Sequence, residues 1–401
     1  MIGCFDTKAE DFYYLHTCLS DLGLKIISIN TGVRESTNKF KVDYNSDECA
    51  LLAGTSIAAL QANENRNDVV QKMGEGASLL IERLISEQNI DGAIGMGGGG
   101  GTYIVLTAMQ TIPFGIPKLC LSTVATKDLS RQVGTKDITL MPSIVDIVGL
   151  NKISRIKIAQ AAGAISGMMT AVVPLYETAK GTIAISMFGN TTRCVEKCTR
   201  LLKAEGYEVL AFHAVGSGGR TMEGLIAEGV IDGVLDITTT ELADELCDGI
   251  CSAGPDRLTA AGKMGVPQVV VPGCIDMVNF GHLDTVPERF RSRQLYSWAP
   301  DVTLMRTNKE ENQQLAMSMA NKLNLAKGEV QVLLPLKGIS IVSAPGGVFH
   351  NSDVDQVLFD SLKDSLDTRI HVKEFDGSIN DPDFASLAVG LLLAMLSLPK
   401  H

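Results

Sequence analysis

The sequence predicts an α/β protein built from two similar doubly wound, Rossmann-like domains with mainly parallel sheets. Two observations lead to this prediction. Short apolar runs alternate with amphipathic, helix-like segments along most of the chain, and several strings of the first half recur in the same order in the second half. Strands that have helices on both sides form parallel sheets covered on both faces.

The predicted elements alternate from the first residues onward. Each strand is an apolar run bounded by turn residues, and each helix has apolar residues at helical spacing. Because Met1 and Ile2 already lie in the first strand, we expect the natural start a few residues upstream. Further strands are predicted over Lys25–Asn30, Gly92–Met96, Lys118–Ser122, Thr182–Met187, Glu208–His213, Gly233–Ile237, Gln268–Val271, Val302–Met305, Gln331–Pro335 and Arg369–Lys373. The helices between them include Lys8–Leu22, Val69–Glu87, Thr191–Ala204 and Glu310–Asn324.

An internal repeat relates the two halves. Its echoes pair Ile2–Lys8 with Ile185–Thr191, Asp91–Gly95 with Asp232–Asp236, Gly115–Leu121 with Gly265–Val271, and Ile138–Met141 with Val302–Met305. Chance similarity between strands is the alternative explanation, but four echoes in one order favour two related domains. We therefore expect an N-terminal domain over residues 1–180 and a C-terminal α/β domain over residues 181–401. The boundary follows the helical stretch Asn151–Leu175.

Composition and charge limit the function classes. Of 401 residues, 35 are Lys or Arg and 46 are Asp or Glu, which gives a net charge of −11. A nucleic-acid binder needs a basic face, so we expect no nucleic-acid partner. No apolar run reaches the ~18 residues that a membrane span needs, so we expect no membrane partner.

The nine cysteines lie within apolar segments, which indicates reduced thiols and a cytoplasmic location. Cys194 and Cys198 are one helical turn apart, as are Cys247 and Cys251. No Cys-x-x-Cys motif or histidine cluster accompanies them, so we expect buried thiols and no metal site.

The strongest local signal is the glycine run Gly95–Thr102. It follows a predicted strand and leads into a helix that we expect to begin near Thr102. Glycine permits positive φ and leaves N–H groups bare, and such groups at a helix N-terminus hold anions. No Gly-Lys-Ser/Thr follows, so this is not a Walker loop. We expect a phosphate or carboxylate to bind Gly97, Gly98, Gly99, Gly100, Gly101 and Thr102; the alternative is a closely packed turn.

Polar residues follow the neighbouring strands of the same domain. Asp6, Thr7 and Lys8 follow the first strand, Thr31 follows the second and Thr123 a later one, and Arg66 precedes a helix. A lysine at a helix N-terminus opposes the helix dipole, a conflict that a bound phosphate would resolve. Helix capping explains Asp6 equally well. Arg66 is either a phosphate clamp or a solvated loop residue.

The second half offers carboxylates near strand ends. Gly216–Arg220 is a second glycine-rich turn, suited to another anionic group or simply a turn. The candidate catalytic residues are Glu223, Asp236, Glu241 and His213. Catalytic pairs need geometry and shifted pKa values, which a sequence does not show, so the catalytic set stays unknown.

Nine strings together resemble one family. They are Phe5–Lys8, Gly95–Thr102, Gly115–Lys118, Ser122–Ala125, Pro142–Asp146, Phe212–Ala214, Gly218–Glu223, Asp236–Glu241 and Asp276–Gly281. The chain resembles, over essentially its whole length, the family formed by the N-terminal region of the tomato mosaic virus resistance protein and its stand-alone bacterial relatives.

This resemblance implies an ATP-type ligand, with or without Mg²⁺, and a homodimer. It implies that the nucleotide is faced by Asp6, Thr7, Lys8, Thr31, Arg66 and Gly97–Gly100. The family loop often has a serine where this chain has Gly99, so one hydroxyl donor is lost. The plant protein continues into a C-terminal barrel domain that this sequence lacks, so its antiviral role, in which it binds a viral replication protein, is not transferred.

Two functions follow as hypotheses. The first is an ATP- or nucleotide-binding protein of open catalytic activity, which holds its ligand at Gly95–Thr102 in an interdomain cleft. The alternative is a metabolic enzyme that acts on a small phosphorylated or carboxylated metabolite. A glycine turn without a catalytic set favours the first, and the polar strand ends of the second half favour the alternative.

Overall fold

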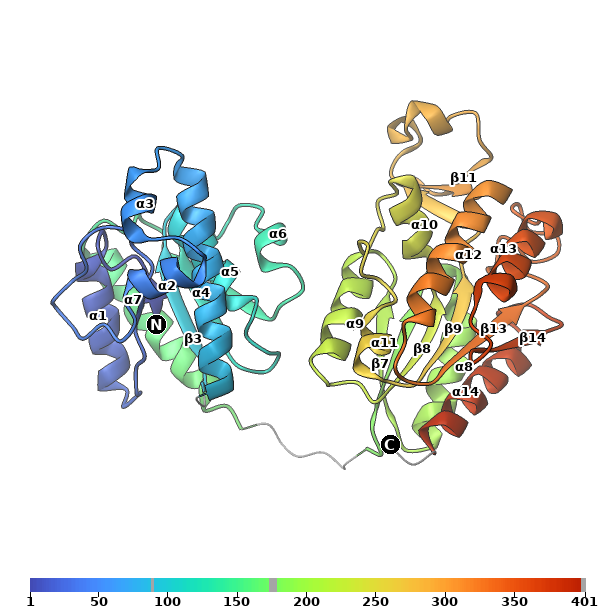
Figure 1. Ribbon diagram of the computed structural model, residues 1–401, viewed down its shortest axis with the longest axis horizontal. Helices are drawn as coiled ribbons and strands as arrows, with labels where there is room; N and C mark the ends of the chain where they lie inside the picture. The colour runs from blue at the N-terminus through green and yellow to red at the C-terminus, as the bar shows by residue number, and fades with distance from the viewer. Residues whose placement is uncertain (88–89, 173–178, 398–401) are drawn as a thin grey trace. The chain divides into compact units, whose positions relative to one another are not determined.

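The computed structural model describes residues 1–87, 90–172 and 179–397 (Figure 1). The chain divides into two compact units, Met1–Pro174 (unit 1) and Leu175–His401 (unit 2). The helical stretch expected before the boundary is α7, and the end of that prediction, from residue 173, lies outside the described residues.

Unit 1 is a five-stranded sheet, sheet A, with helices on both faces (Figure 1). Its strand order is β2-β1-β3-β4-β5, and every neighbouring pair is parallel. The strands are β1 (Ile2–Gly3), β2 (Ile29–Asn30), β3 (Ala93–Gly97), β4 (Lys118–Ser122) and β5 (Ile138–Pro142). The helices are α1 (Ala9–Asp21), α2 (Ser46–Leu52), α3 (Ile57–Ala62), α4 (Arg66–Glu87), α5 (Gly99–Met109), α6 (Ser130–Val133) and α7 (Lys152–Met169).

The core of unit 1 has two layers because residues alternate between the two faces of each strand. On β3, Ala93 packs with the apolar residues of α4 and α5, and Gly95 lies against Val105 of α5. Ile94 and Met96 pack with α1 and α7 on the opposite face. The near-continuous apolar run in β3 follows from this burial on both faces.

Unit 2 contains a six-stranded parallel sheet, sheet B, of order β14-β13-β9-β8-β6-β7. Its strands are β6 (Thr182–Met187), β7 (Glu208–His213), β8 (Gly233–Thr238), β9 (Gln268–Gly273), β13 (Val330–Pro335) and β14 (His371–Phe375). The helices are α8 (Thr192–Ala204), α9 (Ser217–Ala227), α10 (Thr240–Cys247), α11 (Ala260–Met264), α12 (Lys309–Asn324), α13 (Ser352–Ser365) and α14 (Pro382–Leu396). In both units the first strand therefore lies between the second and the third, which confirms two doubly wound α/β units.

Two of the four sequence echoes fall on equivalent strands in the same register. Ala93 pairs with Lys118 in unit 1, and its counterpart Val234 pairs with Gln268 in unit 2. The first echo, which matches Ile2 with Ile185, is shifted by one residue. Ile2 pairs with Gly95 in sheet A. When the β6–β8 register of sheet B is extended, the residue equivalent to Gly95 lies opposite the residue after Ile185.

The fourth echo is wrong. Val302–Met305 belongs to β12 (Val302–Arg306), which lies in a separate antiparallel sheet, sheet C. The other strands of sheet C are β10 (Met277–Phe280) and β11 (Leu295–Ala299). The fifth strand of sheet B is β13 instead. The apolar run of β12 is buried like that of a parallel strand, so its composition did not reveal its antiparallel partners.

Strand β2 is shorter than predicted. Only Ile29 and Asn30 of the predicted Lys25–Asn30 form a strand, and they pair with the two residues of β1. Among the helices of the described ranges, none combines the length and the apolar character that crossing a membrane requires.

Candidate functional site

The first and third strands of unit 1 end where their helices leave to opposite faces of sheet A. Strand β1 leads into α1, on the face with α7, and β3 leads into α5, on the face with α4. Neighbouring strands with such diverging connections open a crevice outside their carboxyl ends, where doubly wound proteins bind ligands. We therefore place the candidate site at this edge of sheet A.

The glycine run is a tight strand-to-helix turn. Strand β3 ends at Gly97, and α5 begins at Gly99, three residues before the predicted start. None of residues 97–101 has a positive φ, and Gly98, the N-cap, has φ −81°, so the expected use of positive φ is wrong. Glycine is required at position 97 by close packing. A Cβ there would lie 2.7 Å from the carbonyl carbon of Gly101 and 2.8 Å from the nitrogen of Thr102.

The first turn of α5 presents bare N–H groups. Gly99, Gly100 and Gly101 are the first three helical residues, whose N–H groups have no acceptor within a helix. Gly98 lacks a side chain, and no described side chain caps this end. Gly99 is exposed, and the two following glycines are half-buried. These N–H groups and the helix dipole together favour a bound anion.

Thr102 stabilises this turn from within the protein. Its buried hydroxyl lies 3.2 Å from the Gly97 carbonyl oxygen, to which it donates, and 2.7 Å from the hydroxyl of Ser122. The N–H of Thr123 also donates to the Gly97 oxygen, at 3.1 Å. The structure therefore gives the Thr102 hydroxyl a supporting role. The Thr123 hydroxyl lies 3.7 Å from the position of a Cβ on Gly98, at the edge of the turn.

Arg66 brings a positive charge to the glycine turn. It is the first residue of α4, its side chain is exposed, and it forms no ion pair with a carboxylate in the described ranges. Its Nη2 lies 3.9 Å from the position that a Cβ on Gly100 would occupy. Helices α4 and α5 pack together in one core layer, which fixes this approach. The structure thus brings Arg66 and the glycine turn together.

The residues after β1 and β2 are largely engaged with each other. The Asp6 carboxylate accepts the N–H of Thr7 at 2.7 Å and that of Arg34 at 3.0 Å. A Cβ on Gly32 would overlap this carboxylate. Thr31 is buried, with its hydroxyl 3.6 Å from the Cys4 sulfur. Asp6 and Thr31 therefore organise the two loops, and Thr7 is the exposed member of this group.

Lys8 points to a different part of the unit. Its ammonium donates to the carbonyl oxygen of Ile147, on the segment that leads into α7. Lys8 also lowers the pKa of the buried Asp11, which burial raises by a larger amount. The sequence suggested a bound phosphate as the partner of Lys8, because a lysine at this position opposes the dipole of α1. The structure gives Lys8 a partner within the chain instead, the Ile147 carbonyl oxygen.

The second glycine-rich turn already holds an anion from the protein. Gly216 and Gly219 at the start of α9 donate their N–H groups to Oε1 of Glu241, at 2.7 and 3.0 Å. A Cβ on Gly219 would overlap the Glu241 carboxylate. The expectation of an external anion at Gly216–Arg220 is therefore wrong for these N–H groups, because an internal carboxylate occupies them.

Three of the four catalytic candidates surround one buried cation, Arg257. Its guanidinium contacts Asp236 through two nitrogens at 2.6 and 2.7 Å, Glu241 at 2.6 Å and Glu223 at 3.2 Å. Glu223 also accepts three N–H groups at the start of α11, those of residues 258–260. Each carboxylate is thus engaged in stabilising the fold, and Arg257 is only 1% exposed.

Sequence reasoning did not identify Arg257. The available signal was indirect: carboxylates at buried strand ends need a cation or several N–H donors nearby. His213, the fourth candidate, ends β7, is exposed, and lies with its ring 5.4 Å from the ring of Phe188. Its ring forms no hydrogen bond with another described residue, so the structure does not join it to the three carboxylates.

Two other buried carboxyls of unit 2 have strongly shifted pKa values. Burial raises the pKa of Asp244 to about 7, against the opposing effect of hydrogen bonds from Asn279 and Cys251. Burial also raises the pKa of Asp276 to about 6. The Asp276 Oδ2 accepts the Ser340 hydroxyl at 2.7 Å, whereas its Oδ1 has no described partner. Over the ranges that the structure describes, no group of three His, Cys, Asp or Glu side chains is arranged to hold a metal ion.

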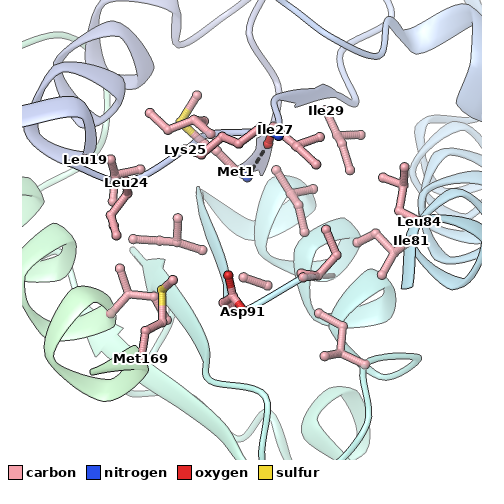
Figure 2. Close-up of a pocket in the computed structure, with 18 residues that line it drawn as sticks. Met1, Leu19, Leu24, Lys25, Ile27, Ile29, Ile81, Leu84, Asp91 and Met169 are labelled. Atoms are coloured by element: carbon pink, nitrogen blue, oxygen red, sulfur yellow. Dashed lines mark hydrogen bonds between the residues drawn. The ribbon is translucent and has the colours of Figure 1, made fainter. Parts of the chain in front are cut away.

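A cavity of about 380 Å³ lies at the opposite, amino-terminal edge of sheet A (Figure 2). Its walls are mostly aliphatic, including Ile81, Leu84, Ile165 and Met169. The helix residues that line it, such as Leu84 and Met169, come from the last turns of their helices, the negative end of the helix dipole, so this cavity does not suit the anion that the glycine turn favours.

Gly97 and Gly99 make a matched pair of substitutions at the glycine turn. Gly97→Ala should lower the free energy of unfolding by about 1–3 kcal/mol, because its Cβ would press on the backbone of residues 101 and 102. Gly99→Ala meets no atom within 4 Å and should be neutral or stabilising by up to about 1 kcal/mol. Urea unfolding of both variants measures this. Equal destabilisation would contradict the geometry of the turn.

The raised pKa of Asp244 makes a prediction about pH. The folded chain keeps this proton to about pH 7, whereas the unfolded chain loses it near 3.8. Its contribution to the free energy of unfolding should therefore fall as the pH rises between these values. Asp244→Asn removes the titration. Rotation of the Asn279 amide would turn the unpartnered Oδ1 of Asn279 toward the NH₂ group of the new side chain, which could then donate to it. In urea unfolding across pH, the native chain should lose stability relative to the variant as pH rises; a constant difference would refute the shift.

Comparison with known proteins is consistent with the two-unit architecture. Family models described as the N-terminal and C-terminal domains of the uncharacterised protein family UPF0261 match residues 1–174 and 180–396. A UPF0261 protein of Clostridium tetani is 42% identical over 99% of this chain and 98% of its own length. A Rhizobium meliloti member is 38% identical over 97% and 96%.

A tomato protein extends the same relationship to plants. The ToMV resistance protein Tm-1(GCR237) of Solanum lycopersicum is 34% identical over 100% of this chain. This chain spans 56% of the length of that protein. The bacterial relatives, by contrast, match it over nearly their whole lengths. Both family models and these relatives show that the chain belongs to the UPF0261 family.

Proposed function

We propose that unit 1 binds a phosphate-bearing nucleotide of the ATP type at the carboxyl-terminal edge of sheet A. The observation that carries this proposal is the uncapped first turn of α5 with Arg66 beside it. Bare N–H groups, the positive end of a helix dipole and a planar cation are the three elements that bind phosphate in proteins. The choice of ATP among phosphate-bearing ligands rests on the family resemblance.

The glycine turn at the start of α9 supports the proposal that an anion binds at the start of α5. In unit 2 the N–H groups at the start of α9 bind the Glu241 carboxylate, which Arg257 balances with its positive charge. In unit 1 the start of α5 has a cation nearby, Arg66, but no carboxylate of the described residues caps its N–H groups. A ligand anion at the start of α5 would take the place that the Glu241 carboxylate takes at the start of α9.

The residues present fit a nucleotide better than a resident metal ion. The Asp6 carboxylate already accepts two N–H groups, and the described ranges offer no metal-binding cluster. If Mg²⁺ takes part, the phosphates and water would bring most of its ligands, because this ion keeps several waters in nucleotide sites. The chain would supply the N–H donors of Gly99–Gly101, the charge of Arg66 and the hydroxyl of Thr123.

The alternative function, an enzyme acting on a small phosphorylated or carboxylated metabolite, rested on the polar strand ends of the second half. Glu223, Asp236 and Glu241 are now explained by Arg257. No specific contact favours the enzyme over the binding protein, and phosphate release from ATP with Mg²⁺ distinguishes them. Stoichiometric binding without release supports a binding protein, whereas release that Arg66→Gln abolishes supports an enzyme.

We also propose a homodimer in the cytoplasm. Four aliphatic side chains in the segment after β5 and at the start of α7 are exposed, namely Ile144, Val148, Ile153 and Ile156. Gathered exposed apolar residues are typical of contact surfaces. All nine cysteines are free, as expected in a reducing compartment.

Sedimentation equilibrium should give twice the chain mass, and a monomer at micromolar concentration would contradict the dimer. Recovery of the protein outside the cytoplasmic fraction would contradict the proposed location.

Arg66 should matter for binding far more than another arginine of the same helix. Arg66→Gln should weaken ATP binding roughly 10-fold, since a charge-assisted contact to phosphate is lost. Arg83→Gln is the matched control, because Arg83 lies near the other end of α4 and pairs with Glu48 at 3.6 Å. Titration calorimetry measures both affinities. Equal affinities for the two variants would remove Arg66 from the site.

A further inference from the structure

The segment that follows β5 is held in a strained conformation. We call this segment, Ser143–Gly149, the β5–α7 loop. Its residue Ile144 has a φ of 69°. A β-branched residue rarely adopts a positive φ, and such a conformation persists only where the surrounding structure holds it. The Ile144 side chain does not supply this restraint, because it is 70% exposed. The restraint therefore comes from other contacts of the loop.

Two side chains at the start of α1 hold the β5–α7 loop. The Lys8 ammonium donates to the carbonyl oxygen of Ile147. One oxygen of the buried Asp11 carboxylate accepts the N–H of Gly149 at 3.0 Å, and its other oxygen has no described partner. Burial raises the pKa of Asp11, whereas the Gly149 N–H and the charge of Lys8 lower it. The Lys8 ammonium thus makes the first contact directly and supports the second through its charge.

Lys8 also belongs to the crevice at the carboxyl end of β1. It is the N-cap residue of α1, where a positive charge opposes the helix dipole. Burial raises the pKa of the Cys4 thiol, which directly follows β1, whereas Lys8 and Arg66 both lower it. Arg66 in turn approaches Gly100, in the first turn of α5. The charges of Lys8 and Arg66 therefore both reach the crevice in which we place the ligand.

A phosphate in this crevice would compete with the loop for the Lys8 ammonium. The Ile147 carbonyl oxygen is a neutral acceptor, whereas phosphate oxygens are charged and form stronger hydrogen bonds with a cation. A phosphate would also offset the positive charge that opposes the dipole of α1. The lysine side chain is a flexible stem with three donors, so it can change its acceptor without a movement of the backbone.

We propose that Lys8 exchanges partners, from the Ile147 carbonyl oxygen to the phosphate of a bound nucleotide, and that this exchange releases the β5–α7 loop. The inference rests on the nucleotide site proposed above. Release lets the backbone of Ile144 relax, so the strain in the loop favours ligand binding. By linkage, a change that stabilises the held loop weakens ligand binding by the same factor. Ile144 and Val148 are part of the exposed apolar surface proposed for the dimer, so the exchange carries the state of the nucleotide site to that surface.

The first test compares two loop variants that each replace an exposed aliphatic side chain by asparagine. Asparagine tolerates a positive φ, so Ile144→Asn should relieve the strain of the held loop. Val148 is 75% exposed and has no positive φ, so Val148→Asn is the matched control. Ile144→Asn should weaken the binding of inorganic pyrophosphate about 5-fold, and Val148→Asn should leave it unchanged. Titration calorimetry measures both affinities.

The second test follows the loop itself through hydrogen exchange at the Gly149 amide. Saturating pyrophosphate should speed this exchange in the native chain by about 10-fold or more, because the loop is released. Lys8→Met removes the ammonium but keeps an aliphatic side chain. This variant should show fast exchange at Gly149 without pyrophosphate and no further change when pyrophosphate is added.

Equal affinities of the two asparagine variants for pyrophosphate would overturn the proposed exchange. So would an unchanged Gly149 exchange rate in the native chain when pyrophosphate shifts the amide signals of Gly99–Gly101. That second result would leave the nucleotide site itself intact. If pyrophosphate and ATP move neither the Gly99–Gly101 signals nor the exchange at Gly149, the nucleotide site and the exchange both fail.

Discussion

The proposed anion site of unit 1 depends on one constraint, the close packing of Gly97 against the start of α5. The chain turns from β3 into the helix within one residue, and the N–H groups of Gly99–Gly101 have no side-chain cap among the described residues. The hydroxyl of Thr102 holds this turn to β4 through Ser122. The position of Arg66 follows from the packing of α4 on α5. The proposed phosphate site thus rests on a turn whose close packing favours glycine at position 97.

The two units share one fold but differ in what lies at their glycine-rich helix starts. A glycine-rich helix start needs a negative group, and unit 2 provides Glu241 from within the chain. That carboxylate shares Arg257 with Asp236 and Glu223, which makes the three carboxylates part of one structural cluster. Removing the cation alone would leave buried carboxylates unpaired, an expensive outcome in a protein interior. Unit 1 keeps its helix start open and is the part suited to an external ligand.

The sequence predicted the strands well where burial on both faces makes an apolar run, as in Lys118–Ser122 and Thr182–Met187. It failed at β12, because an antiparallel strand covered on both faces has the same composition as a parallel one. It also assigned positive φ to the glycine run, in which close packing at Gly97 is what requires a glycine. The glycine turn and Arg66 could be predicted as site residues from the sequence because the chemistry that suggests them is local. The shared partner of Glu223, Asp236 and Glu241 could not be found, since Arg257 lies 16 to 34 residues away from them in the sequence.

The most direct test of the account is the amide spectrum of ¹⁵N-labelled protein during a titration with ATP and, separately, with inorganic pyrophosphate. The account predicts that both ligands shift the N–H signals of Gly99, Gly100 and Gly101 most, and leave those of Gly216 and Gly219 in place because Glu241 already occupies them. Unmoved signals at Gly99–Gly101 at saturating ligand, or larger shifts at Gly216 and Gly219, would contradict it.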